Sequence, residues 1–415
     1  MFHFQSGFSS SALLGFVGGE KNLAALEATY VNGRRHVPSA FNSPGSYLAA
    51  TGFSRLAKSR VWDGSHAGVS VDPNALTSTS TSSSGPKFIA AFSGSALPAT
   101  GPIAKMLADY SRKLPVTVVE GRVTTSSSVT IVELPDAPDS EVHPLTRISA
   151  PVTLPFLASG AAAAACGVVG DWTTLAMIVL GMASNGFSSI ALQSGDLTFT
   201  RPITTPGAPA GDGYLESGSE IIVLKGSEAA VSSVTRGRFT LRYRGESALR
   251  AFSICSSLLT LQCIIQLLII PQGTYLGQLF FLVTMIISWL YNSYVVRQEA
   301  AVWEKLVLED LLKAPTMKRY SLGTRTQAAV FLMQVLKPAD VEEQLSLLIP
   351  NNTPVWKTWR QTVARGLQDS RPRFEGAEYY DAAESFNDDE KKLLAILLSD
   401  AQSAVEASIG VSGKF

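Results

Sequence analysis

Two long apolar stretches, separated by a short turn, lie in the second half of the chain. They cover residues 251–270 and 275–296, and no Asp, Glu, Lys or Arg occurs from 251 to 296. A helix that crosses about 30 Å of hydrocarbon needs about 20 residues. Pro271 and Gly273 favour a turn between the stretches, because proline cannot continue a helix and glycine frees the backbone. The pattern predicts a transmembrane helical hairpin.

A second pair of apolar stretches, at 151–169 and 173–192, flanks Gly170-Asp171-Trp172. Alanine and glycine are frequent in the first stretch and add little insertion energy. The spacings Gly160/Ala164 and Ala163/Gly167 nevertheless allow helix backbones to approach closely in lipid. A buried hairpin of a soluble domain is the alternative interpretation, and we favour the membrane. Together the two pairs predict four transmembrane helices.

The segments outside the hairpins have the patterns of soluble structure. Residues 1–145 are expected to be partly disordered, with a flexible Ser/Thr tract at 77–85. Short apolar runs predict strands at 116–119, 129–132, 220–225, 229–235 and 238–244. Helical patterns follow at 326–336, 341–348, 355–367 and 388–409, and Asp388 is the expected N-cap of the last one.

The expected fold is therefore mainly α. It is a four-helix transmembrane protein made of two helical hairpins, with a small β-rich cytoplasmic insertion and a helical cytoplasmic C-terminal region. The expected domains are an N-terminal region 1–145, hairpin 146–192, insertion 193–247, hairpin 248–296 and C-terminal region 297–415.

Positive charges near the apolar stretches predict the orientation. The two hairpin turns carry no Lys or Arg, whereas the segment between the hairpins and the residues after 296 carry many. Cytoplasmic loops are enriched in Lys and Arg. Both termini and the central segment are therefore expected in the cytoplasm, although the sequence does not identify the membrane.

Composition supports a membrane protein and excludes some other classes. Charged residues make up 16% of the chain, below the ~25% of an average soluble domain. The net charge of zero gives the whole chain no attraction for nucleic acid. The three cysteines lie inside apolar stretches, which does not suit a secreted disulfide framework.

The sequence contains no strong catalytic or cofactor signature, so we expect no enzyme, no cofactor and no metal. All four histidines precede the apolar stretches and lack metal-ligand spacing. A membrane-bound enzyme is a third alternative, and His143 and Asp171 are its best candidate residues.

Polar residues within the apolar stretches are the main candidate site. Gln262 and Gln266 are four residues apart, so they share one helix face, while Asn185 and Gln278 lie on two other helices. Buried amides in lipid usually form hydrogen bonds between helices. The alternative is a pore lined by these four residues. We favour the structural interpretation, since no ionisable group accompanies the amides.

Arginines in the last candidate strand are a second candidate site. Arg238, Arg242 and Arg244 alternate with apolar residues, and Arg236 precedes them. A solvated sheet face is one interpretation. Contact with anionic lipid headgroups is the other, because the strand ends a few residues before an apolar stretch.

Several motifs over about residues 248–366 resemble a family of uncharacterised fungal membrane proteins of the basidiomycete type. The resemblance rests on Gln266-Leu-Leu-Ile-Ile-Pro-Gln-Gly-Thr274, Gly277-Gln278, Ser288-Trp-Leu-Tyr-Asn-Ser293, Tyr320-Ser-Leu-Gly-Thr-Arg-Thr326 and Asn352-Thr-Pro-Val-Trp356. It implies a multi-pass membrane location and carries over no activity, substrate or site residue.

The expected role is a non-enzymatic membrane scaffold or interaction protein. Its expected partners are the lipid bilayer, anionic headgroups and a protein bound to the cytoplasmic tail. The alternative is a channel or small-solute transporter subunit, which requires a homo-oligomer because four thin helices make a poor pathway alone.

Overall fold

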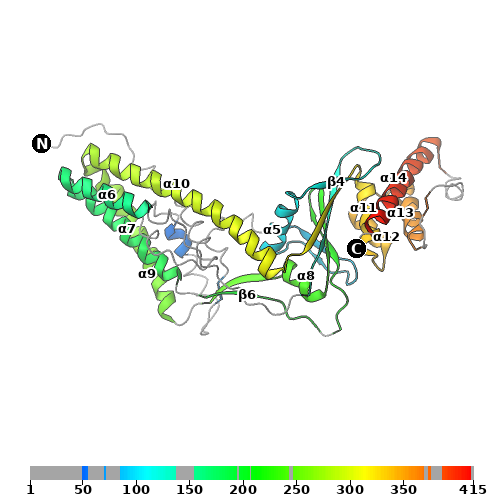
Figure 1. The fold of residues 1–415 in the computed structure, drawn as a ribbon, viewed down its shortest axis with the longest axis horizontal. Coiled ribbons are helices and arrows are strands. Elements are labelled where there is room, and N and C mark those ends of the chain that lie inside the picture. The colour runs from blue at the N-terminus through cyan, green and yellow to red at the C-terminus, as the bar shows by residue number, and fades with distance from the viewer. Residues whose placement is uncertain are drawn as a thin grey trace. The chain divides into compact units, whose positions relative to one another are not determined.

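A computed structural model describes residues 49–54, 70–71, 85–136, 154–193, 196–205, 207–242, 246–368, 373–374 and 386–412. The chain divides into two compact units, each assembled from three separate stretches (Figure 1). Unit 1 consists of Met1–Ser83, Glu141–Thr200 and Arg238–Leu306. Unit 2 consists of Ser84–Ser140, Arg201–Gly237 and Val307–Phe415. This grouping differs from the five consecutive domains that the sequence suggested.

Unit 1 contains the two expected helical hairpins. The first is α6 (Leu154–Val169) with α7 (Trp172–Gln193), and the second is α9 (Glu246–Ile269) with α10 (Tyr275–Leu306). Helix α7 packs against α9, and α6 packs against α10. The first hairpin therefore lies between the two helices of the second.

Three helices of the described residues, not four, are long and apolar enough to cross a membrane. They are Trp172–Leu192, Arg250–Gln272 and Tyr275–Arg297. Helix α6 has 16 residues, or about 24 Å at ~1.5 Å per residue. It stops at Gly170, whose φ of 81° suits a residue without a side chain. Asp171 N–H then donates to the Cys166 carbonyl at 2.9 Å and closes the helix end.

A small antiparallel sheet completes unit 1. Strand β9 (Arg238–Arg242) lies between β1 (Ser70–Val71) and β6 (Asp196–Thr200). The rings of Phe199 and Phe239 stack across it with centroids 4.9 Å apart. A short helical segment at 49–54 packs on α9, where Phe53 lies against Phe252.

Unit 2 is built around a seven-stranded mixed sheet, which is much larger than the small β-rich insertion that the sequence predicted. Strands β5 and β8 run parallel, as do β10 and β4, and the other pairs are antiparallel. In spatial order the strands are β3 (Ala96–Leu97), β2 (Lys87–Ala90), β7 (Gly213–Ser217), β8 (Glu220–Lys225), β5 (Ser127–Glu133), β10 (Thr316–Leu322) and β4 (Val116–Val118).

Each of the three stretches of unit 2 supplies strands to this one sheet. Strands β2, β3, β4 and β5 come from the first stretch, β7 and β8 from the second, and β10 from the third. The first hairpin separates the first stretch from the second in sequence, and the second hairpin separates the second from the third. Their strands nevertheless alternate across the sheet, so the sheet forms only when all three meet.

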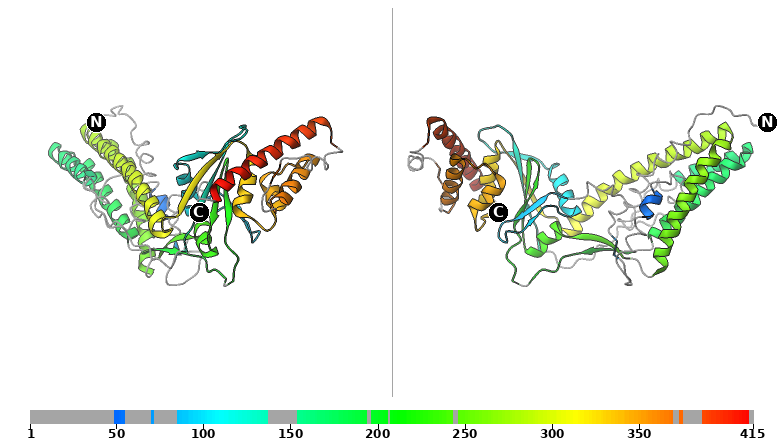
Figure 2. Two further views of the ribbon diagram at one scale, coloured as in Figure 1. Left: turned by 45° about the vertical axis from the view of Figure 1, so that its right-hand side comes forward. Right: turned by 180° about the vertical axis from the view of Figure 1, so that it is seen from behind.

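Helices cover both faces of the sheet (Figures 1 and 2). One face carries α5 (Pro102–Ser111) and α8 (Glu228–Thr235). The other carries α11 (Arg325–Leu336), α12 (Val341–Leu348), α13 (Pro354–Gly366) and α14 (Asp388–Ser412), joined to it by a large hydrophobic core. Trp359 is fully buried there, and the partly buried Trp356 packs against its ring and the same core.

Most local predictions for unit 2 are confirmed, and two are wrong. The four C-terminal helices and the strands at 116–119 and 129–132 lie close to their expected positions. The predicted strand at 229–235 is instead helix α8, because the Ser227 hydroxyl accepts the Ala230 N–H and caps it. The cap of α14 is Asn387 rather than Asp388, since its side chain accepts the Glu390 N–H. Nearly all of the Ser/Thr tract lies outside the described residues.

Candidate functional site

The four helices of the two hairpins, α6, α7, α9 and α10, are called the four long helices below. They are apolar outside and partly polar inside. Most of the large apolar side chains that are exposed in the described residues lie on these helices. Their buried positions instead include many polar residues. These are Ser159, Thr174, Ser184, Asn185, Ser188, Ser189, Gln262, Gln266, Thr284, Ser288 and Asn292. A water-soluble bundle has the opposite pattern, so this surface is suited to a hydrocarbon solvent.

Asp171 joins the turns of the two hairpins. It caps α7, since its Oδ1 accepts the Thr174 N–H at 3.0 Å and the Thr173 hydroxyl at 2.7 Å. Its Oδ2 accepts the N–H and the hydroxyl of Thr274 at 2.7 and 2.8 Å, and the Thr174 hydroxyl at 3.0 Å. Thr274 in turn caps α10 by accepting the Gly277 N–H. One carboxylate thus connects the N-termini of α7 and α10.

The surroundings of Asp171 keep it ionised. Only 4% of the residue is exposed, and this burial raises its pKa. Hydrogen bonds from Thr174, Thr173 and Thr274 outweigh the burial and hold the pKa well below the ordinary value. The N-termini of two helices also favour a negative charge here.

Two glycines allow the hairpin turns to approach this closely. A Cβ atom at Gly277 would overlap Oδ2 of Asp171, and one at Gly273 would overlap the Thr174 hydroxyl. The sequence identified Gly273 only as a turn residue. The contact itself joins Asp171 to a residue 103 positions away, so no local pattern predicts it.

The structure connects two of the four predicted seam residues. Gln262 donates from Nε2 to Oε1 of Gln266 at 3.3 Å, and Gln266 donates to the Met177 carbonyl on α7 at 3.2 Å. Asn185 is buried on α7, eight residues beyond Met177. Gln278 instead donates to the Gly273 carbonyl in the turn of its own hairpin.

The arginine site is described only in part. Arg236 is exposed at the C-terminal end of α8, and Arg238 is exposed at the start of β9, where its neighbour Phe239 is buried. This alternation agrees with the predicted strand. The Arg242 side chain and the whole of Arg244 lie outside the described residues, as does His143.

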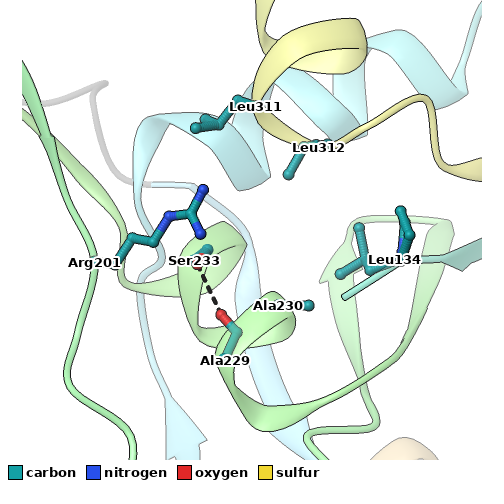
Figure 3. A pocket seen from close by; sticks show the side chains of 8 residues that line it. Leu134, Arg201, Ala229, Ala230, Ser233, Leu311 and Leu312 are labelled. Atoms are coloured by element: carbon teal, nitrogen blue, oxygen red, sulfur yellow. Dashed lines mark hydrogen bonds between the residues drawn. The ribbon is translucent and has the colours of Figure 1, made fainter. Parts of the chain in front are cut away.

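A small pocket lies in unit 2 where the end of β5, α8 and the π-helix Val307–Leu311 meet (Figure 3). Its walls are mainly apolar, with Arg201 at one side; they include Leu134, Ala230, Leu311 and Leu312. The interior has room for about one water molecule. It is therefore too small for an organic ligand.

A second buried carboxylate joins the C-terminal helices to the sheet of unit 2. Asp400 on α14 accepts hydrogen bonds from the hydroxyls of Thr324 and Thr326, at 3.1 and 2.5 Å. Arg122 donates to the same carboxylate at 2.8 Å, and this bond raises the pKa of the guanidinium. Thr324 also caps α11. No local sequence pattern predicts this site, because its members come from distant stretches.

No group of three or more His, Cys, Asp or Glu side chains among the described residues has the geometry to hold a metal ion. Comparisons with protein-family models, curated proteins and solved structures find no match. The resemblance to fungal membrane proteins therefore stays a prediction.

Proposed function

We propose that this chain is a multi-pass membrane protein whose four long helices cross the bilayer and whose unit 2 is a single folded body on one side. Its proposed role is a non-enzymatic scaffold that presents unit 2 to a protein partner. The observation that carries the membrane location is the apolar outer surface of the four helices. Large exposed apolar surfaces of this kind mark contacts with lipid or protein.

The sheet of unit 2 supports an even number of crossings in each hairpin. Strands β5 and β8 are hydrogen-bonded neighbours, although α6 and α7 lie between them in sequence. Both strands must be on the same side of the membrane, so α7 cannot cross alone. Strands β8 and β10 pair with opposite edges of β5, although the second hairpin lies between them in sequence. These two strands must also share one side of the membrane, so α9 and α10 cross together or not at all.

This argument favours a crossing by α6 despite its 16 residues. The sequence is free of charged residues from 148 to 170, so the apolar stretch is longer than the helix itself. A short helix is also tolerated when the bilayer thins locally, at fractions of a kcal/mol per Å of mismatch. Lys and Arg around the helix ends favour a cytoplasmic unit 2, with the hairpin turns on the opposite side.

The two buried carboxylates of the described structure, Asp171 and Asp400, connect structural elements, which supports a scaffold role. Asp171 and Asp400 are buried carboxylates of the kind that often serve catalysis. Each accepts hydrogen bonds that hold distant elements together. The Gln262–Gln266–Met177 connection likewise favours contact between helices over a pore. A channel subunit remains the alternative, and solute flux through purified protein in liposomes would favour it.

Labelling of single cysteines in intact cells, in a chain whose Cys166, Cys255 and Cys263 are replaced by Ala, tests the topology. Trp172→Cys and Tyr275→Cys place thiols at the two hairpin turns, and Lys392→Cys places one on unit 2; all three positions are exposed. A membrane-impermeant maleimide added outside should label both turns in a plasma-membrane protein. It should label position 392 only after permeabilisation. In an internal membrane, sealed vesicles give the equivalent comparison.

Labelling of a turn and of position 392 from the same side would contradict the four-crossing topology. The scaffold role needs a separate test, in which the full-length chain is cross-linked in native membranes. Recovery of a protein partner on unit 2 is the expected result. Absence of any partner, together with solute flux in liposomes, would replace the scaffold by the channel.

A further inference from the structure

Each of the four long helices buries a polar atom that has no hydrogen-bond partner in the described structure. These atoms are the hydroxyls of Ser159 on α6, Ser189 on α7 and Ser288 on α10, and Oε1 of Gln262 on α9. Each residue is at most 1% exposed. An unpaired polar atom away from water is costly, and in lipid no solvent compensates it. With the Ser293 hydroxyl, which is also unpaired on α10, five such atoms in one bundle require an explanation.

Because Asp171 joins the two hairpin turns, the distance of each atom along its helix can be counted from the same level. At ~1.5 Å per residue, Gln262 lies about 12 Å from its turn, Ser159 about 15 Å, Ser288 about 20 Å and Ser189 about 26 Å. The same count places Gln266 about 6 Å and Met177 about 8 Å from the turns. Those two residues are hydrogen-bonded to each other, which agrees with their similar distances from the turns. The four atoms are thus spread along the bundle interior, from about 12 to about 26 Å from the turns.

Apolar side chains also occupy part of the bundle interior. A cluster that includes Ala163, Cys166, Met177, Phe281 and Met285 fills the space near the turns. By the same rise per residue, this apolar cluster lies within about 15 Å of the turns. Ser288 and Ser189 therefore lie farther from the turns than this cluster, while Gln262 and Ser159 lie at the level of its far end.

We propose that the interior of the bundle binds internal water molecules, which form hydrogen bonds with Ser159, Ser189, Gln262 and Ser288. This inference rests on the proposed membrane location. A buried water typically makes about three hydrogen bonds and both donates and accepts. Hydroxyls and an amide oxygen offer the matching groups. No charged side chain occurs from 172 to 195 or from 251 to 296, so the site suits a neutral ligand.

Alanine substitution distinguishes a hydrated hydroxyl from a dry one. Removing a hydroxyl that has no partner at all should stabilise the protein, whereas removing one that binds water should destabilise it. We expect Ser288→Ala and Ser159→Ala in the full-length chain to lower the melting temperature in lipid nanodiscs. The matched control is Ser184→Ala, because the Ser184 hydroxyl already donates to the Leu180 carbonyl at 2.8 Å. We expect the losses for Ser288→Ala and Ser159→Ala to be comparable to that of this control, and a melting temperature equal to or above that of the wild type for either variant would overturn the proposal.

Water-edited solid-state NMR of the labelled protein in bilayers gives an independent measurement. Signals of Ser159 and Ser288 should receive magnetisation from water at short mixing times, while those of Ala163 and Met285 in the apolar cluster should not. Equal absence of transfer at all four residues would reject the water site. Carbonate extraction of the same membranes separates the two hypotheses: release into the supernatant rejects the membrane location, whereas retention without water transfer rejects only this inference.

Discussion

At the scale of single residues, Asp171 shows how one charge can hold two hairpins together. The sequence marked it as an interruption between two apolar stretches and as a weak catalytic candidate. Its five hydrogen bonds come from residues on both hairpins. The local part, an Asp before a helix, is readable as an N-cap. The Thr274 partner is not, because only the tertiary arrangement brings it near.

Replacing Asp171 by Ala should destabilise the bundle by about 3 kcal/mol, because the buried donors of Thr174 and the partly buried donors of Thr274 lose a charged acceptor. The free energy of unfolding in detergent or lipid measures the effect. Thr173→Ala, which removes one partly buried donor, serves as the control and should cost about 1 kcal/mol. Similar losses for the two variants would mean that the connection between hairpins contributes little.

Acidification should weaken the same contact. The folded state lowers the pKa of Asp171, so the unfolded chain binds its proton more readily. The contribution to stability is therefore complete above the ordinary aspartate pKa of about 3.9 and decreases as the pH falls below it. Unfolding measured between pH 6 and pH 3 should show a steeper loss for the wild type than for Asp171→Asn. Parallel curves would argue against an ionised Asp171.

At the scale of elements, helix and strand positions were largely readable from the sequence, and their ends and exceptions were not. The apolar, β-branched run around Val231 and Val234 predicts a strand where helix α8 forms. The Ser227 cap and Glu228 in the first turn favour the helix instead. Helix α6 is shorter than its apolar stretch since Gly170 closes it. In both cases a terminal residue decided the outcome.

Gly277 controls how closely α10 approaches α7. Gly277→Ala should push the turns apart, because the added Cβ would overlap the Asp171 carboxylate, and we expect a loss of about 2 kcal/mol. Gly160→Ala is a matched control on an exposed helix position with no atom near the added Cβ. It should be neutral or stabilise by up to about 1 kcal/mol. Equal stability of the two variants in thermal unfolding would contradict this role of Gly277.

At the scale of the whole molecule, the sequence predicted the pieces but not their assembly. The expected domains followed one another along the chain, whereas unit 2 interleaves three stretches in one sheet. Pairings such as Val129 with Ile221, or Thr130 with Arg319, join residues that no local pattern relates. The C-terminal region is therefore not a separate body, since β10 lies between β5 and β4. Partner searches need the full-length chain rather than residues 297–415 alone.

The place of β10 in the middle of the sheet has a consequence for biosynthesis. Strand β5 ends at Glu133 and β10 begins at Thr316, so the ribosome has already produced both hairpins before the strand that completes the sheet emerges. In the proposed topology, the nascent chain inserts its apolar helices while Val129 and Ile131 still lack the cover of α11 and its neighbours. A chaperone that shields these strands is expected during translation, and truncated products that end before β10 should be removed by quality control.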